Sequence, residues 1–318
     1  MLLWGLLLLL CFLLYYKWYS KQEEILGKKI YVDPYNGPVR DDDSIFVSIA
    51  SYRDPDCTNT LHDLFHKASF PARVFVGLVE QNKKQDQNCF DSFSFSKNVR
   101  QIRLHYNQAR GPCYARYLAS CLYRGETFFF QIDSHTKFEY GWDARLIHML
   151  KEMPSNAIIS NYPISWTDRD NSSVPRFSTT RRHGSYYVFN SGFSDMKTKH
   201  EKHFATSGGM LFMRGHTLLQ VPYDAELDWV FEGEEFLYSA RLFTYGYDFY
   251  RPTQNVVSHF YDRKDRPKFW SDLHRFRNQV DPVQTVHERM KKPPFRYFGN
   301  TRSLQEYIQL LEKHLKQS

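Results

Sequence analysis

The sequence predicts an α/β fold with a mostly parallel central sheet that helices cover on both faces. Short apolar runs alternate with helical stretches along residues 45–160, and this alternation is typical of parallel strands joined by crossover helices. The length of 318 residues suits one large domain with additions at its ends, or two small domains. The hydrophobic fraction of 42% allows that domain a packed core.

The pattern of apolar residues gives the order of the elements. Strands are expected over residues 45–50, 73–79, 99–105, 127–132, 157–160 and 210–213. Helices are expected over residues 59–68, 142–153, 234–245 and 303–316, and another starts with Pro112 in its first turn. We expect the polar stretch 168–184 to be a mobile loop and residues 249–257 to be mostly extended.

The first residues predict a single membrane anchor over residues 1–19. No charged side chain occurs before Lys17, leucine dominates, and Trp18 and Tyr19 suit the edge of a bilayer. A cleaved signal peptide is the alternative, but a basic start and a small-residue cleavage site are missing. A linker over 20–44, a main domain over 45–292 and a C-terminal helical extension over 293–318 are predicted to follow.

The side of the membrane that the main domain faces stays open. Lysines follow the anchor and none precedes it, which favours the cytosolic face slightly over the lumen of the Golgi or endoplasmic reticulum. Asn171 begins a glycosylation triplet, which would suit the lumen. Of the five cysteines, the four outside the leader could form two disulfides or none, although Cys113 and Cys121 on one helix cannot pair with each other.

The charge of the chain excludes one class of partner. The formal net charge is +7, from 42 Lys and Arg against 35 Asp and Glu, and it is spread along the chain. This balance favours an anionic ligand such as a diphosphate. Nucleic-acid binding is not expected, because it needs a concentrated basic stripe.

Two loops at the carboxyl ends of predicted strands are the expected site. One follows Ala50, and the other begins with Asp133, Ser134 and His135 directly after an apolar strand. Ligands of parallel sheets bind at these strand ends. A carboxylate and an imidazole two residues apart can share a metal ion, and this oxygen–nitrogen mixture suits Mn²⁺ better than Mg²⁺, the alternative ion.

Several ordered blocks of this sequence resemble the polypeptide and hydroxyproline α-N-acetylglucosaminyltransferases, a retaining family of GT-A fold. The blocks are SIASYRDP from Ser48, ARGPCYAR from Ala109, GETFFFQIDSH from Gly125, TSGGMLF from Thr206, EGEEFLYSARLFTYGYDFYRP from Glu232, SHFYDR from Ser258 and RPKFW from Arg266. The order of the blocks is also similar, more distantly, to the mucin-type polypeptide N-acetylgalactosaminyltransferases, which use a DxH element and a later histidine.

The resemblance implies a role for particular residues. The metal ligands it implies are Asp133, His135 and His259. The donor-binding residues it implies are Ala50, Ser51, Tyr52, Arg53, Gly111, Arg116, Ser207, Gly208 and Gly209. Asp133 and Glu234 are the implied catalytic residues, with Glu235 as the fallback for the acid near the sugar. The triplet 41–43 also looks like the DxD metal element of sugar transferases, but no strand precedes it and we interpret it as linker.

The function expected from this resemblance is a Mn²⁺-dependent retaining transfer of a sugar, N-acetylglucosamine first, from a UDP-sugar. The acceptor is a hydroxyl of hydroxyproline, serine or threonine, or of a glycan. Two alternatives remain open at this point. A non-haem Fe(II) oxygenase would use the same carboxylate and two histidines, and a membrane-tethered binding module would have no activity.

Overall fold

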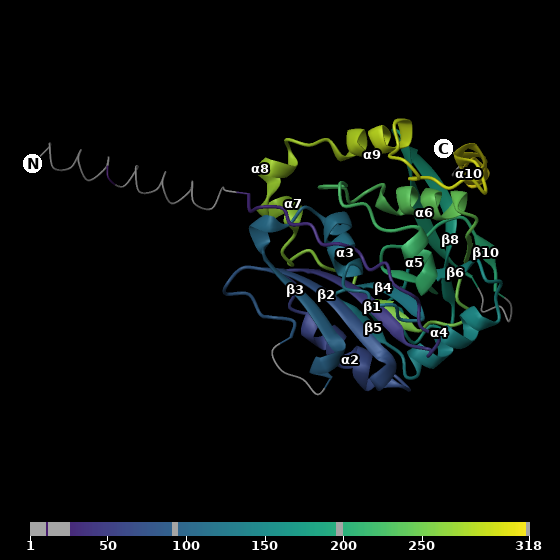
Figure 1. The fold of residues 1–318 in the computed structure, drawn as a ribbon, viewed down its shortest axis with the longest axis horizontal. Coiled ribbons are helices and arrows are strands. Elements are labelled where there is room, and N and C mark those ends of the chain that lie inside the picture. The colour runs from purple at the N-terminus through teal and green to yellow at the C-terminus, as the bar shows by residue number, and fades with distance from the viewer. Residues whose placement is uncertain (1–10, 12–25, 91–94, 195–199, 316–318) are drawn as a thin grey trace, which may run out of the picture.

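An eight-stranded mixed sheet forms the centre of the computed structural model, which describes residues 11, 26–90, 95–194 and 200–315 (Figure 1). Its strand order is β10-β12-β6-β11-β4-β1-β2-β3. The strands are β1 (Ile45–Tyr52), β2 (Val74–Asn82), β3 (Val99–His105), β4 (Phe128–Asp133), β6 (Ala157–Ser160), β10 (Lys202–His203), β11 (Met210–Arg214) and β12 (Asp248–Tyr250). Strands β4, β1, β2 and β3 are parallel, whereas β11 runs antiparallel between β4 and β6. The predicted α/β fold is confirmed, with a sheet that is mixed and mostly parallel.

Helices cover both faces of this sheet. Alternate residues of a strand point to opposite faces, and in β1 Val47 and Ile49 pack with α2 (Cys57–His66) and α4 (Trp142–Lys151). Phe46 lies on the other face, in a cluster with residues of α3 (Pro112–Ser120), α5 (Gly215–Gln220) and α6 (Glu234–Thr244). The late helices α9 (Pro282–Lys291) and α10 (Leu304–Glu312) contact α6 at the top of Figure 1.

A small second sheet brings a late segment to the end of β4. Its strands are β5 (Thr136–Phe138), β13 (Val257–His259) and β7 (Ile164–Ser165). Strand β5 begins three residues after β4 ends, and β13 pairs antiparallel with it so that His259 lies opposite Thr136. This pairing places His259 beside His135.

The predicted loop over residues 168–184 is wrong. Strand β8 (Val174–His183) occupies much of it and pairs antiparallel with β9 (Tyr186–Ser194) as a two-stranded sheet. Polar residues fill β8, and an irregularity between Phe177 and Thr179 breaks the period of two. Both features hide the strand from a search for apolar alternation. The extended stretch expected over 249–257 is two separate short strands, and α7 (Phe269–Asp272), α8 (His274–Arg277) and α9 were not predicted.

Part of the predicted linker packs onto the main domain. The backbone of Ile30 exchanges hydrogen bonds with the hydroxyl of Tyr114, and that of Val32 with the hydroxyl of Tyr117, both on α3. The acidic triplet 41–43 lies just before β1, at the end of this strand that is far from Ala50. Asp43 of the triplet pairs with Lys151. Except for Cys11, the predicted anchor over 1–19 lies outside the described residues. Within the described part of the chain, no helix has the length and apolar character to cross a bilayer.

The cysteines form one disulfide in the described structure. Cys57 at the start of α2 is bonded to Cys89 in the connection after β2. Cys113 and Cys121 are buried as free thiols, in agreement with the prediction that these two do not pair.

Candidate metal and donor site

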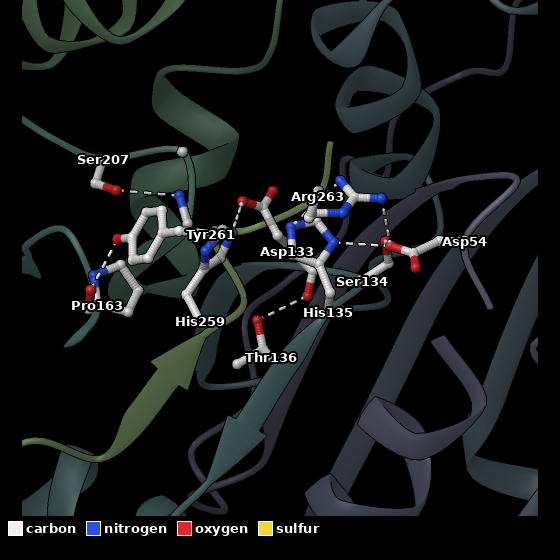
Figure 2. A network of polar contacts seen from close by, with 12 residues as sticks. Asp54, Asp133, Ser134, His135, Thr136, Pro163, Ser207, His259, Tyr261 and Arg263 are labelled. Carbon is white, nitrogen blue, oxygen red and sulfur yellow. Dashed lines mark hydrogen bonds and ion pairs between the residues drawn. The ribbon is translucent and has the colours of Figure 1, made fainter. Parts of the chain in front are cut away.

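Three residues from two distant segments converge at the end of β4. Asp133 is the last residue of β4, His135 follows two residues later, and His259 ends β13. One ligand atom of each lies within 4.8 Å of the others, and Figure 2 shows the three side chains turned toward one another. Atoms bonded to one ion at about 2.1 to 2.4 Å lie no more than about 4.2 to 4.8 Å apart. The three residues therefore fit a single ion with at most a small closing movement.

The carboxylate of Asp133 is kept ionised by its neighbours. His259 Nε2 lies 3.1 Å from its Oδ2, and Arg116 Nη2 on α3 donates to its Oδ1 at 3.1 Å. Burial alone would raise the pKa of Asp133, but the hydrogen bond from His259 and the positive charge of Arg116 outweigh it and hold the pKa well below its usual range. An ionised carboxylate is the form that a metal ion needs.

His259 is incompletely satisfied by the described residues. Its ring is buried, and its Nδ1 has no hydrogen-bond partner within the described part of the chain. Burial lowers the pKa of His259 although Asp133 acts in the opposite direction, so the neutral imidazole that ligates metals is favoured. The nitrogen beside the ionised carboxylate is Nε2, so a neutral His259 offers Nε2 to an ion that Asp133 also binds.

These side chains form one wall of a cleft of about 540 Å³. Most of the predicted donor residues also line it. They are Ala50, Tyr52, Gly111, Arg116, Gly208 and Gly209, together with Glu234 and Glu235. The cleft therefore joins segments from β1, α3, the start of β11 and the start of α6, as the resemblance implies.

Three predicted donor residues do not line this cleft. Ser51 is fully buried and its Oγ lies 3.5 Å from Cys89 Sγ, because in β1 it points away from the face that carries Ala50. Ser207 is buried too, and its Oγ accepts a hydrogen bond from Gly209 N at 3.0 Å. Ser51 and Ser207 therefore lie next to residues that line the cleft, but their own side chains do not line it.

Arg53, the third of these residues, holds two loops together. It has a positive φ of 49°, and its guanidinium pairs with Asp86 at 2.6 Å and with Asp272 at 2.7 Å. Asp272 also accepts a hydrogen bond from the Tyr52 hydroxyl at 2.9 Å. Arg53 thus positions Tyr52, which does line the cleft.

The sequence matches a known enzyme family over nearly the whole main domain. Residues 44–96 and 91–317 match the family model described as Glycosyltransferase (GlcNAc). The chain belongs to this glycosyltransferase family. A search of curated protein sequences gives no match. The family match overturns the alternative of an iron oxygenase.

Solved structures of other transferases share the fold of this glycosyltransferase. GalNAc-T7, crystallised with UDP, GalNAc and Mn²⁺, matches with a TM-score of 0.54 and 12% identity over 84% of this chain and 56% of that one. TarS from S. aureus (residues 1–349), crystallised with UDP-GlcNAc, matches with a TM-score of 0.55 and 12% identity over 85% of this chain and 71% of that one. The chain spans little more than half the length of GalNAc-T7. At such low identity these matches show the GT-A fold alone.

Two adjacent carboxylates of the glycosyltransferase differ in their surroundings. Glu234 is paired with Arg116 at 2.5 Å and accepts from Cys113 Sγ at 3.3 Å. Glu235 is held by neutral donors, the Tyr162 hydroxyl and Gly208 N at 2.8 Å. Burial raises the pKa of Glu235 to about 7, more than these two hydrogen bonds lower it. Near neutral pH Glu235 is therefore a titrating carboxyl on the wall of the cleft.

Several residues of the transferase site were not singled out from the sequence. They are Asp54, Tyr162, Tyr261 and Arg263, which touch the metal candidates, Glu235 or the cleft. Asp54 and Arg263 stand inside the blocks SIASYRDP and SHFYDR, so their neighbourhood was visible in the sequence but their partners were not. Tyr162 lies outside every block, and nothing local marks it.

Proposed function

We propose that this protein is a metal-dependent glycosyltransferase that takes UDP-GlcNAc as its donor. The sugar passes to a hydroxyl of a polypeptide or of a glycan with retention of its anomeric configuration. The observation that carries the proposal is the convergence of Asp133, His135 and His259 on the wall of a cleft. The family match supports the reaction class, and the UDP-GlcNAc and Mn²⁺ bound by structural relatives support the donor and the ion.

The proposed ion is held by Asp133, His135 and His259, and Mn²⁺ suits this set of oxygen and nitrogen ligands. When bound, it supplies a positive charge that stabilises the departing diphosphate. Three cationic side chains, Arg263, Lys264 and Lys268, line the same cleft. They add positive charge on the side where a diphosphate would lie.

The part of the cleft around Arg116 has the features of a sugar pocket. Gly208 and Gly209 line the cleft without adding a side chain to it, and Glu234 and Glu235 offer acceptors for sugar hydroxyls. Because Arg116 holds Glu234 in place, that carboxylate is suited to binding a hydroxyl more than to moving a proton. Retention requires no side-chain nucleophile in the family that the chain resembles, so the proposal assigns none.

The decisive experiment measures UDP release by the purified full chain with a panel of UDP-sugars, with Mn²⁺ and with EDTA. We expect release to be fastest with UDP-GlcNAc and Mn²⁺, and to stop in EDTA. Asp133→Ala should abolish turnover while the protein stays folded, with a melting temperature lowered because Arg116 and His259 lose a partner. Asp41→Ala is the matched control, because it alters the acidic triplet far from the cleft and should keep full activity. Metal-independent release, or full activity of Asp133→Ala, would refute the proposal.

We also propose that the catalytic domain faces an oxidising lumen, tethered by the predicted anchor over residues 1–19. The support is the disulfide between Cys57 and Cys89, because disulfides persist in the secretory pathway and are rare in the cytosol. It outweighs the slight cytosolic preference of the lysines that follow the anchor. Protease protection of the domain in sealed microsomes tests this orientation, and digestion of the domain without detergent would contradict it.

A further inference from the structure

We propose that Asp54 is a positioning residue of the metal centre, which fixes the His135 ring so that Nε2 is free to bind the ion. The inference rests on the proposed metal site and adds a residue outside the three ligands. Asp54 lies in the loop between β1 and α2, and its carboxylate reaches across to the segment after β4 (Figure 2). It is 3% exposed, so its position is determined by protein contacts.

The carboxylate of Asp54 is bonded at both oxygens. Its Oδ2 lies 2.7 Å from His135 Nδ1 and accepts from Ser134 Oγ at 2.6 Å and from Arg263 Nη2 at 3.1 Å. Its Oδ1 accepts from Asp56 N at 3.1 Å. The orientation of the carboxylate is therefore fixed independently of His135.

Two neighbours impose the same tautomer on His135. Both oxygens of Asp54 already accept hydrogen bonds, from Arg263 Nη2 at Oδ2 and from Asp56 N at Oδ1, so the carboxylate acts as the acceptor toward His135 and Nδ1 carries the proton. On the other side of the ring, Arg263 Nη1 lies 3.5 Å from Nε2. A guanidinium only donates, so Nε2 must present its lone pair. The lone pair of His135 is thus on the nitrogen that lies away from Asp54.

This arrangement matches a general feature of metal-binding histidines. The ring nitrogen that does not bind the metal usually donates to a carboxylate or carbonyl, which fixes the tautomer and raises the basicity of the ligand. A purely structural role for Asp54 is the rival explanation, since it also ties Ser134 and Arg263 to the loop after β1. The two explanations differ in what they predict for metal affinity when the fold is kept.

The test is a Mn²⁺ titration of the full chain in detergent, followed through the EPR signal of the free ion. Asp54→Asn keeps the size of the side chain and removes its charge, and we expect Mn²⁺ to bind about 10- to 100-fold more weakly. Asp56→Asn is the matched control. Asp56 lies two residues away and pairs with Arg266 at 2.9 Å, and its loss should leave Mn²⁺ affinity unchanged. Melting temperatures show that each variant is folded.

A double-mutant cycle shows whether the effect passes through the histidine. In a His135→Ala background, Asp54→Asn should weaken Mn²⁺ binding no further. A second measurement needs no variant at Asp54: nitrogen NMR of the metal-free wild type, with His135 assigned by comparison with His135→Ala, should show its proton on Nδ1. A proton on Nε2, or equal Mn²⁺ affinity of Asp54→Asn and wild type, would overturn the inference. Failure of the wild type to bind Mn²⁺ would instead overturn the proposed function.

Discussion

The substitution Gly208→Ala tests why the chain has a glycine two residues before β11. A Cβ at this position would lie 2.7 Å from Arg116 Nη2, 3.0 Å from its Nη1 and 3.1 Å from its Cζ. Neither Gly208 nor Gly209 is among the described glycines with positive φ, so the conflict is steric and not a matter of backbone strain. Gly208 therefore provides clearance for a guanidinium.

The loss of stability expected for Gly208→Ala follows from the hydrogen bonds that Arg116 would lose. Ordinary contacts of this kind need about 3.5 Å, so the guanidinium has to retreat by roughly 0.5 to 1 Å. That movement breaks the bonds of 3.1 Å to Asp133 and 3.3 Å to Gly208 O. Lost charge-assisted bonds and overpacking together cost about 2 to 4 kcal/mol. For a domain of this size, the melting temperature should fall by roughly 5 to 12 °C, and turnover should fall because Asp133 loses its support.

The adjacent glycine supplies the control. A Cβ on Gly209 would lie 3.3 Å from Pro163 Cδ and 3.4 Å from Asp133 Oδ2, so Gly209→Ala should cost less than about 1 kcal/mol of stability. In an Arg116→Met background, which lacks the clashing nitrogens, Gly208→Ala should lose most of its effect. Scanning calorimetry measures all four variants. A Gly208→Ala protein that melts with the wild type would refute the clearance argument.

Two further predictions concern titration and redox state. In the folded protein the pKa of Glu235 is about 7, above its ordinary value of 4.5. Its proton therefore stabilises the fold at low pH, and this contribution is lost as the pH rises through 7. Glu235→Gln should therefore gain melting temperature relative to wild type at pH 8 but not at pH 5, with an upper limit of about 3 kcal/mol; an equal difference at both pH values contradicts the assignment. Cys57→Ser and Cys89→Ser should each cost roughly 2 to 4 kcal/mol, and thiol counting on the denatured, unreduced protein should find Cys11, Cys113 and Cys121 free. Five free thiols would contradict both the disulfide and the lumenal orientation.

The elements that carry the metal site were predictable to different degrees. Strands β1 and β4 are continuous apolar runs, so their carboxyl ends and the loops after them follow from the sequence. Asp133 ends β4 and His135 follows two residues later, and this position makes both of them candidates. His259 has no such local signal, because β13 is only three residues long and its partner β5 lies far away in the sequence. Only the resemblance pointed to it.

Contacts between side chains were the part that the sequence could not supply. Arg53 was assigned to the donor, yet it is held by Asp86 and Asp272. From the sequence alone, a charged residue in a loop could pair with many residues of opposite charge. Only the fold determines which of them lies close enough. Glu234 and Glu235 are chemically identical in the sequence, and only the structure separates them, through Arg116 beside one and neutral donors beside the other.

The charges around the metal candidates predict that Mn²⁺ and UDP each strengthen the binding of the other. Three carboxylates, Asp54, Asp133 and Glu234, are paired with two guanidinium groups, Arg116 and Arg263, and these five side chains together carry a formal charge of −1. A divalent ion would change this sum to +1 and would add to the attraction that Lys264 and Lys268 already offer a diphosphate. Opposite unit charges about 4 Å apart interact by about 4 kcal/mol at an effective dielectric constant near 20, so UDP should bind at least about tenfold more tightly with Mn²⁺ than with EDTA. Because binding linkage is reciprocal, UDP must strengthen Mn²⁺ binding by the same factor. Calorimetric titrations in both orders check this, and equal UDP affinity with and without the ion would show that the charge reversal has no role.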